Sequence, residues 1–379
     1  MITRAIEANG LTKTYGKVQA LNGLSLDVEP GTVFGLLGPN GAGKSTTVKI
    51  LTTLSRPTGG TAHVMGIDVM KNPDKVRRVI GCVIQQPSVD PTATGRENLH
   101  LQGALYGMPY RQLKRRAAEL LDRFGLGEAA GRLARTYSGG MLRKLDVAMG
   151  LVHRPRVLFL DEPTTGLDPE ARAEMWTEIA RLTGDEGLTI LLTTHYLDEA
   201  DRLASRLAIV DKGRVVVTGS PEDLKSELRG DAVSVDLADA GDHRRARQAL
   251  AGVGAVRELT LVGRGLRARV DDAAATLPAV LAALDAAGVA VSSVSISRPS
   301  LDDVYLRYAG RAFSDAHLAP ALSADTGHAP ATSADAGHAS ATSADAGHAP
   351  APAADAAGAS RARTESPAGD GFGRDGRVA

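Results

Sequence analysis

"GPNGAGKST", residues 38–46, is the stretch that decides the fold of this 379-residue chain. It fits the phosphate-loop pattern G-x-x-x-x-G-K-[ST]. The run VFGLL (33–37) before it is apolar enough for a buried strand, and STTVKILTTL (45–54) after it has a helical pattern. A strand, this loop and a helix in that order predict a nucleotide-phosphate site.

The residue types in the loop match what a phosphate group requires. Glycines let backbone N–H groups close around the phosphates, Lys44 reaches the β- and γ-phosphates, and Ser45 places a hydroxyl on Mg²⁺. The predicted nucleotide-binding residues of the loop are Gly38, Pro39, Asn40, Gly41, Ala42, Gly43, Lys44, Ser45 and Thr46.

Two further apolar runs end in polar residues. RVLFLDE (156–162) is a predicted strand that places Asp161 and Glu162 at the carboxyl edge of a sheet, where α/β proteins bind ligands. We expect Asp161 to hold Mg²⁺ and Glu162 to orient or deprotonate the attacking water. TILLTTH (189–195) ends at His195, which can donate a hydrogen bond to the γ-phosphate.

Two other side chains are candidates for the same site. Gln85 follows the predicted strand RVIGCVI (78–84) and is expected to contact both the metal and the attacking water, with Gln86 as the alternative in the same turn. Tyr15 is a candidate for stacking on adenine.

A second glycine-rich stretch, RTYSGGMLRKLDVAMGLV (135–152), reads as a loop that opens into a helix with one apolar face. Ser138, Gly139 and Gly140 precede that face, and their small side chains leave the helix N-terminus open to an anion. The chain therefore has two predicted phosphate-binding loops.

Residues 1–220 alternate strand-like and helical patterns, which predicts an α/β domain with a mainly parallel sheet, and residues 94–135 are charged and helical. Residues 221–310 have the order βαββαβ, which predicts a small ferredoxin-like α+β module. Residues 311–379 contain ten-residue repeats rich in Ala, Pro, Ser and Asp, and we expect this tail to be disordered.

Composition excludes several functions. Lysine and arginine together number 44, as do aspartate and glutamate, so the chain has no basic field for nucleic acid. The single cysteine, Cys82, favours a reducing, cytosolic setting. No signal peptide is recognisable, and no stretch approaches the ~20 apolar residues of a membrane span. We therefore expect a soluble protein whose membrane role needs a partner.

With these motifs, residues 3–220 resemble the ATP-binding subunit of an ABC transporter. GPNGAGKST matches the Walker A loop of that family, Gln85 its Q-loop, YSGGM (137–141) its signature, VLFLDE (157–162) its Walker B strand, GLDP (166–169) its D-loop and His195 its switch histidine. The usual signature is LSGGQ, and Met141 stands where that glutamine would make a polar contact. The signature YSGGM, FLDEPTTGLDP and SRPSLDDVYLRYAG (297–310) further resemble the daunorubicin/doxorubicin resistance ATP-binding subunits.

The resemblance implies a RecA-like core sheet, a helical subdomain at about 87–150 and a small antiparallel β part. It implies Mg-ATP bound between two head-to-tail copies, with Ser138, Gly139 and Gly140 of one copy on the ATP of the other and Asp168 in the D-loop. It also implies an ABC-2-type permease as partner, a place at the cytoplasmic face of the membrane, and export of a hydrophobic drug-like compound.

The motifs alone are compatible with other functions. An ATPase for another cargo, such as a lipid, a polysaccharide or an imported solute, shares the same motifs. Importer ATPases often carry an OB-like barrel, which the helices predicted after residue 230 disfavour. A non-transport ABC protein usually has two cassettes or a coiled-coil insertion, and neither pattern is present. A purely regulatory module would lack the acid that Glu162 provides.

Overall fold

The computed structural model describes residues 4–228, 230–262, 264–310 and 313. Its largest sheet has six strands in the order β10-β9-β3-β8-β7-β6. The strands are β3 (Val33–Leu37), β6 (Ile80–Val83), β7 (Val157–Asp161), β8 (Thr189–Thr194), β9 (Arg206–Asp211) and β10 (Arg214–Gly219). All neighbours pair in parallel except β9 and β10. The predicted α/β fold with a mainly parallel sheet is confirmed.

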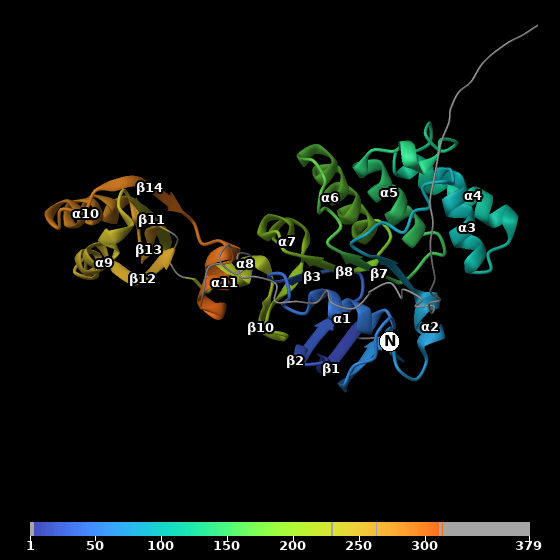
Figure 1. Cartoon of the computed structure of the whole chain (residues 1–379), viewed down its shortest axis with the longest axis horizontal. Coiled ribbons are helices and arrows are strands. Elements are labelled where there is room, and N and C mark those ends of the chain that lie inside the picture. The colour runs from blue at the N-terminus through green and yellow to red at the C-terminus, as the bar shows by residue number, and fades with distance from the viewer. Residues whose placement is uncertain (1–3, 229, 263, 311–312, 314–379) are drawn as a thin grey trace, which may run out of the picture. The chain divides into compact units, whose positions relative to one another are not determined.

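Helices cover both faces of this sheet (Figure 1). Alternate strand residues belong to different cores: Leu158 and Leu160 pack with α5 and α6, whereas Val157 and Phe159 pack with α1. The helices are α1 (Lys44–Leu51), α2 (Pro73–Val79), α5 (Gly139–Gly150), α6 (Pro169–Gly184) and α7 (Leu197–Leu203). Because successive side chains of a strand point to opposite faces of the sheet, each face packs against its own set of helices.

The charged region at 94–135 is helical, as predicted, and contains α3 (Gly95–Leu105), α4 (Tyr110–Arg123) and the short 3₁₀ helix η1 (Ala134–Thr136). A capping box between Thr94 and Glu97 starts α3. In α4 the buried residues Leu113, Ala117 and Leu120 recur at helical spacing, so the charged residues between them face solvent.

A second, antiparallel sheet has the order β2-β1-β4-β5. Its strands are β1 (Ile6–Tyr15), β2 (Val18–Val28), β4 (Gly59–Val64) and β5 (Ile67–Asp68). Residues of β1, β2 and β4 share one hydrophobic core with α1 and the main sheet. This is the small antiparallel part that the resemblance implied.

The C-terminal part has the predicted order βαββαβ and a hydrophobic core of its own. Its elements are β11 (Asp231–Leu237), η2 (Ala240–Asp242), α9 (His243–Ala251), β12 (Val256–Val262), β13 (Gly265–Val270), α10 (Ala273–Ala286) and β14 (Val291–Ser297). The antiparallel sheet order β12-β13-β11-β14 is that of a ferredoxin-like fold.

Two further helices, α8 (Pro221–Ser226) and α11 (Leu301–Ala309), lie outside that core. Tyr305 of α11 is fully buried with residues of α7 and β9, and its hydroxyl lies 3.4 Å from a carboxylate oxygen of Asp211. Phe313 packs edge-on against Tyr305, at 4.8 Å between ring centroids, and is 4% exposed. Phe313 falls within the expected disordered tail, so folded packing continues past residue 310; residues 314–379 lie outside the described residues.

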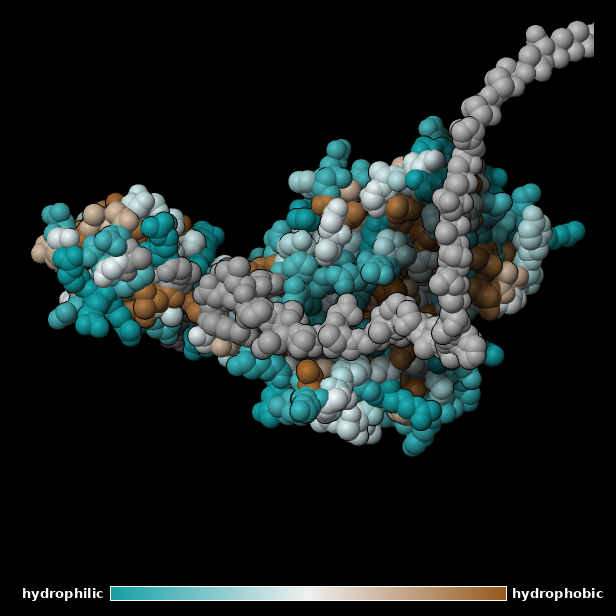
Figure 2. Space-filling model, in the orientation of Figure 1, coloured by the Kyte–Doolittle hydropathy of each residue, from teal (hydrophilic) through white to brown (hydrophobic). Residues whose placement is uncertain are grey.

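Hydrophobic side chains are scattered among hydrophilic ones on the face drawn in Figure 2. Among the helices that the structure describes, none is long and apolar enough to span a bilayer.

Candidate functional site

The predicted phosphate loop joins β3 to α1 and needs glycine at several positions. Gly41 and Gly43 have φ values of 79° and 108°, which favour glycine. A Cβ on Gly38 would lie 2.4 Å from the carbonyl oxygen of Val210, and one on Gly43 would lie 2.7 Å from Leu21. The loop is therefore a tight backbone turn at the carboxyl end of β3 that has no space for a side chain at positions 38 and 43.

Lys44 directs its amine back into this loop. Its Nζ donates to the carbonyl oxygens of Gly38 at 2.7 Å and Pro39 at 3.2 Å, and it lies 3.4 Å from Oε1 of Glu162. The side chain is 4% exposed. Burial lowers the pKa of Lys44, and the carboxylates of Glu162 and Asp161 partly offset this. A buried ammonium that faces the loop is suited to pair with phosphate oxygens.

Asp161 and Ser45 bring oxygen ligands together beside the loop. Asp161 is the last residue of β7, and its Oδ1 accepts a hydrogen bond from Ser45 Oγ at 3.2 Å and another from Thr193 Oγ1. One carboxylate and a hydroxyl next to a phosphate loop are the hard ligands that Mg²⁺ uses together with substrate phosphates and water. The donor set thus fits the predicted metal.

Glu162 is the point on which the other predicted side chains converge. His195 Nδ1 lies 3.2 Å from its Oε2, and Gln85 Nε2 donates to the same oxygen at 3.4 Å. The backbone of Glu162 has a φ of 49°, in the left-handed region, and its N–H bonds Thr193 at 3.1 Å. Residues from the ends of β6, β7 and β8 and from α1 thereby meet at one carboxylate.

The pKa of Glu162 reflects these neighbours. Burial alone would raise it, but the hydrogen bond from His195 and the charge of Lys44 outweigh burial and hold the pKa below its ordinary value. Glu162 is therefore an ionised carboxylate at neutral pH and can accept a proton or a hydrogen bond from water.

The remaining predicted residues lie elsewhere. Ser138 is the N-cap of α5 and is exposed together with Gly139, while a Cβ on Gly140 would lie 3.0 Å from Ala171 of α6. Asp168 caps α6 through the backbone N–H of Ala171. Ser138, Gly139 and Gly140 thus begin α5 and Asp168 begins α6, and no described contact joins these residues to Glu162.

Two other predictions concern single side chains. Tyr15 is 46% exposed, with the Lys13 amine 4.7 Å from its ring centroid, and no described contact joins it to the phosphate loop. Both glutamines in the turn after β6 are exposed, and the structure brings Gln85 to Glu162, while no described hydrogen bond joins Gln86 to it.

Sequence reasoning missed several residues of this site. Thr193 links Asp161 to the backbone of Glu162, and Thr165 donates to the Glu162 carboxylate at 3.4 Å. Arg143 and Asp146 form a buried pair on α5. Their three-residue spacing on a largely apolar helix was the available signal.

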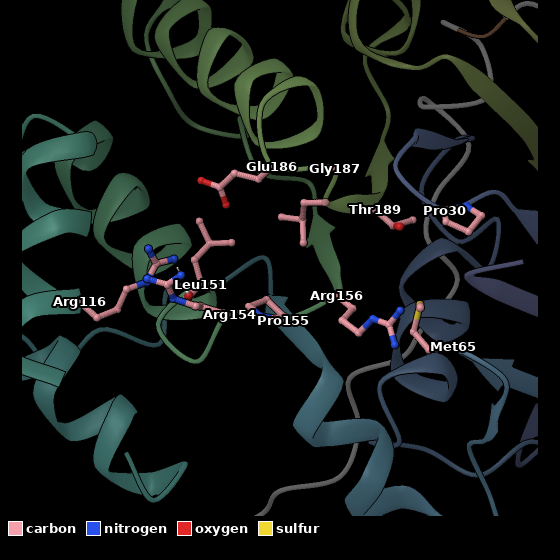
Figure 3. A pocket seen from close by; sticks show the side chains of 11 residues that line it. Pro30, Met65, Arg116, Leu151, Arg154, Pro155, Arg156, Glu186, Gly187 and Thr189 are labelled. Carbon is pink, nitrogen blue, oxygen red and sulfur yellow. Dashed lines mark hydrogen bonds between the residues drawn. The ribbon is translucent and has the colours of Figure 1, made fainter. Parts of the chain in front are cut away.

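A cavity of about 600 Å³ lies at the amino-terminal ends of the main-sheet strands, beside the first residues of β7 and β8. Figure 3 shows Arg116, Arg154, Arg156 and Glu186 around it, and its lining includes none of the predicted site residues. Loop geometry and converging side chains, rather than this hollow, locate the candidate site.

Comparisons with known proteins agree with the motifs. The family model "ABC transporter" matches residues 21–165, and the model "ATP-binding protein DrrA1-3-like, C-terminal domain" matches residues 219–309. The chain is 48% identical to the daunorubicin/doxorubicin resistance ATP-binding protein DrrA of Streptomyces peucetius, over 83% of this chain and 94% of that protein. It is 34% identical to the linearmycin resistance ATP-binding protein LnrL of Bacillus subtilis, over 82% of this chain and 100% of that protein.

A solved structure supports the fold. The dimeric ATP-binding cassette MJ0796, bound to ADP and Pi, matches with a TM-score of 0.52 and 28% identity, over 57% of this chain and 98% of that one. The predicted P-loop fold of the ATP-binding cassette type is confirmed.

Proposed function

The chain belongs to the daunorubicin/doxorubicin resistance family of ABC transporter ATP-binding subunits, and from this premise we propose that two copies close head to tail around two molecules of Mg-ATP and couple hydrolysis to drug export through a separate permease. The observation that carries the proposal is the convergence of Lys44, Gln85 and His195 on the Glu162 carboxylate beside the phosphate loop.

Each residue of the site has a definite task in this proposal. The backbone of residues 38–46 and the amine of Lys44 hold the β- and γ-phosphates. Glu162 accepts a proton from the attacking water, and its low pKa keeps it ionised for that purpose. His195 and Gln85 fix the carboxylate and the γ-phosphate end of the nucleotide, while Tyr15 stacks on adenine.

Ser45, Asp161 and Gln85 are the proposed holders of Mg²⁺. An ion held there would supply positive charge that offsets the charge of the phosphate groups. The hydrogen bond from Thr193 fixes the Asp161 carboxylate toward Ser45, so the two oxygen ligands are already close to each other.

The exposed N-terminus of α5 is the basis for the head-to-tail pair. Ser138 and Gly139 are exposed at a helix N-terminus, and no described contact joins Ser138, Gly139 or Gly140 to the chain's own phosphate loop, so we assign them to the γ-phosphate of a partner's ATP. Asp168 lies at the N-terminus of α6, next to this loop, and belongs to the same interface.

The dimer is tested with Ser138→Arg, which places a long charged side chain in the space meant for the partner's γ-phosphate. In a Glu162→Gln background, which slows turnover, we expect ATP to dimerise the Ser138 parent and not the Ser138→Arg variant, as measured by size-exclusion chromatography with light scattering. Equal dimerisation of both proteins would refute the trans contact.

The membrane partner is proposed to be an ABC-2-type permease, with this subunit at the cytoplasmic face and a hydrophobic drug-like compound as cargo. Expression of the chain together with its permease in a sensitive host should lower anthracycline accumulation, and Lys44→Ala should abolish the effect because the γ-phosphate loses its cation. Efflux that persists with Lys44→Ala would show that ATP bound here does not drive transport.

A further inference from the structure

Arg143 is a buried arginine of α5 whose guanidinium reaches out of its own helix. The residue is 4% exposed. Its Nη1 donates to the carbonyl oxygen of Ile84 at 2.6 Å, its Nη2 to that of Asp161 at 3.1 Å, and its Nε to that of Pro163 at 2.8 Å. The side chain thus binds the ends of two different strands from a third element.

The three carbonyl groups lie next to the two residues at the centre of the site. Ile84 precedes Gln85, and Asp161 and Pro163 flank Glu162 on both sides. Arg143 therefore fixes the backbone from which the Gln85 amide and the Glu162 carboxylate project.

Asp146 extends the same arrangement further along the Q-loop. Its Oδ2 lies 3.2 Å from Arg143 Nη1, and its Oδ1 accepts from the backbone N–H of Ser88 at 3.1 Å and from the Ser88 hydroxyl at 2.8 Å. The turn that carries Gln85 is thus attached to α5 at both ends, at residues 84 and 88.

The chemistry of the side chain matters here. A guanidinium is a rigid planar fork whose five donors lie on three nitrogens, so it can hold three separated carbonyl groups at fixed relative positions, whereas the three donors of an ammonium all lie on one nitrogen that rotates freely. In a buried setting each of these hydrogen bonds is costly to lose. Arg143 therefore fixes a geometry and does more than neutralise Asp146.

We propose that Arg143 is a positioning residue that fixes Gln85 and Glu162 relative to the N-terminus of α5. This inference rests on the proposed function, which places that N-terminus on the partner's ATP. Arg143 then makes one rigid connection between the loop that contacts the partner's ATP and the residues that hydrolyse the chain's own ATP. Contact of α5 with one nucleotide then sets the geometry at the other.

The test is Arg143→Met in the full-length chain, with nucleotide affinity and turnover measured separately. We expect kcat to fall at least about tenfold, since a misplacement of about 1 Å of reacting groups costs up to about a hundredfold. Nucleotide Kd should stay within about threefold of wild type, because Arg143 makes no described contact with the Lys44 loop. Arg143→Lys should restore only part of kcat.

Two controls separate positioning from general damage. Arg143→Met leaves the Asp146 charge buried without its partner, so the double variant Arg143→Met/Asp146→Asn is made as well, and we expect it to fold and to keep the low kcat. Arg116→Met is the matched control, because Arg116 donates to the Leu151 carbonyl oxygen at 3.2 Å, its side chain is 12% exposed, and it touches neither the Q-loop nor Glu162. Its kcat should match wild type.

Three results would overturn the inference: an unchanged kcat in Arg143→Met, recovery of kcat in the double variant, or a loss of nucleotide affinity in proportion to kcat. The dimer proposal fails separately. If Glu162→Gln protein does not dimerise with ATP while Arg143→Met still lowers kcat, Arg143 positions the chain's own site and the head-to-tail pair is wrong.

Discussion

Glu162→Gln tests the centre of the site most directly, because it changes charge and proton affinity while nearly keeping the shape. The carboxylate lies 3.4 Å from Lys44 Nζ, 3.2 Å from His195 Nδ1 and 3.4 Å from Gln85 Nε2. An amide at the same place cannot accept the proton of the attacking water. The expected loss is that of a general base, about 10²- to 10⁴-fold in kcat, or roughly 3–5 kcal/mol in the activation free energy.

The same variant should bind ATP at least as tightly as wild type. The Glu162 carboxylate pairs with the buried Lys44 amine, and in the proposed complex the anionic γ-phosphate pairs with the same amine, so removal of the carboxylate charge removes a repulsion from the bound phosphate. Binding is measured with a fluorescent ATP analogue, and turnover as steady-state phosphate release.

Glu199→Gln is the matched control for this prediction. Glu199 is also a buried glutamate, but it bonds Thr164 and Trp176 and has a raised pKa because of burial. Its replacement should leave phosphate release near the wild-type rate. Phosphate release close to wild type in Glu162→Gln, or an equal loss in both variants, would refute the assignment of Glu162 as the base.

Further outcomes follow from the described contacts. Gly38→Ala should weaken ATP binding by about tenfold or more, because the added Cβ would lie 2.4 Å from the Val210 carbonyl oxygen and the phosphate loop must shift; an unchanged Kd would contradict this. Burial raises the pKa of Cys82 from 9.0 to about 12, so at pH 8 the native thiol should hold about a thousandfold less thiolate and react correspondingly more slowly with a thiol reagent than in denaturant. A chain that ends at Phe313 should keep the melting temperature of the full chain. A chain that ends at Gly310 lacks the buried Phe313 ring and should lose about 3 kcal/mol of unfolding free energy, as measured by urea denaturation.

The parts of the site that the sequence predicts are those with local causes. Gly43, Lys44 and Ser45 are adjacent in the chain, and the strand before them and the helix after them fix their conformation. Asp161, Glu162 and His195 end apolar strands, and parallel strands bring their carboxyl ends to one edge of a sheet. Contiguous patterns and one rule of sheet geometry are enough to place these residues together.

The parts that the sequence does not predict depend on packing between distant segments. Arg143 meets Ile84 across 59 positions of the chain, and Tyr305 meets Asp211 across 94. Periodicity in α5 places Arg143 on a helix but does not reveal which carbonyl groups face it. The return of α11 onto β9 has no local signal either, because the residues that bury α11 lie on β9 and α7, far from it in the sequence.

The two glycine-rich loops differ in the reason for which they contain glycine. At Gly38 and Gly43 an added Cβ would collide with atoms of the same chain, so these glycines are needed for the phosphate loop to fold. At Gly139 an added Cβ meets nothing within 4 Å, so the fold of this chain does not require glycine there. Glycine at this position leaves the backbone accessible to a group that approaches from outside, and the proposed contact with a partner's ATP is such a group. A substitution at Gly38 should therefore act within one chain, and a substitution at Gly139 only where two chains meet.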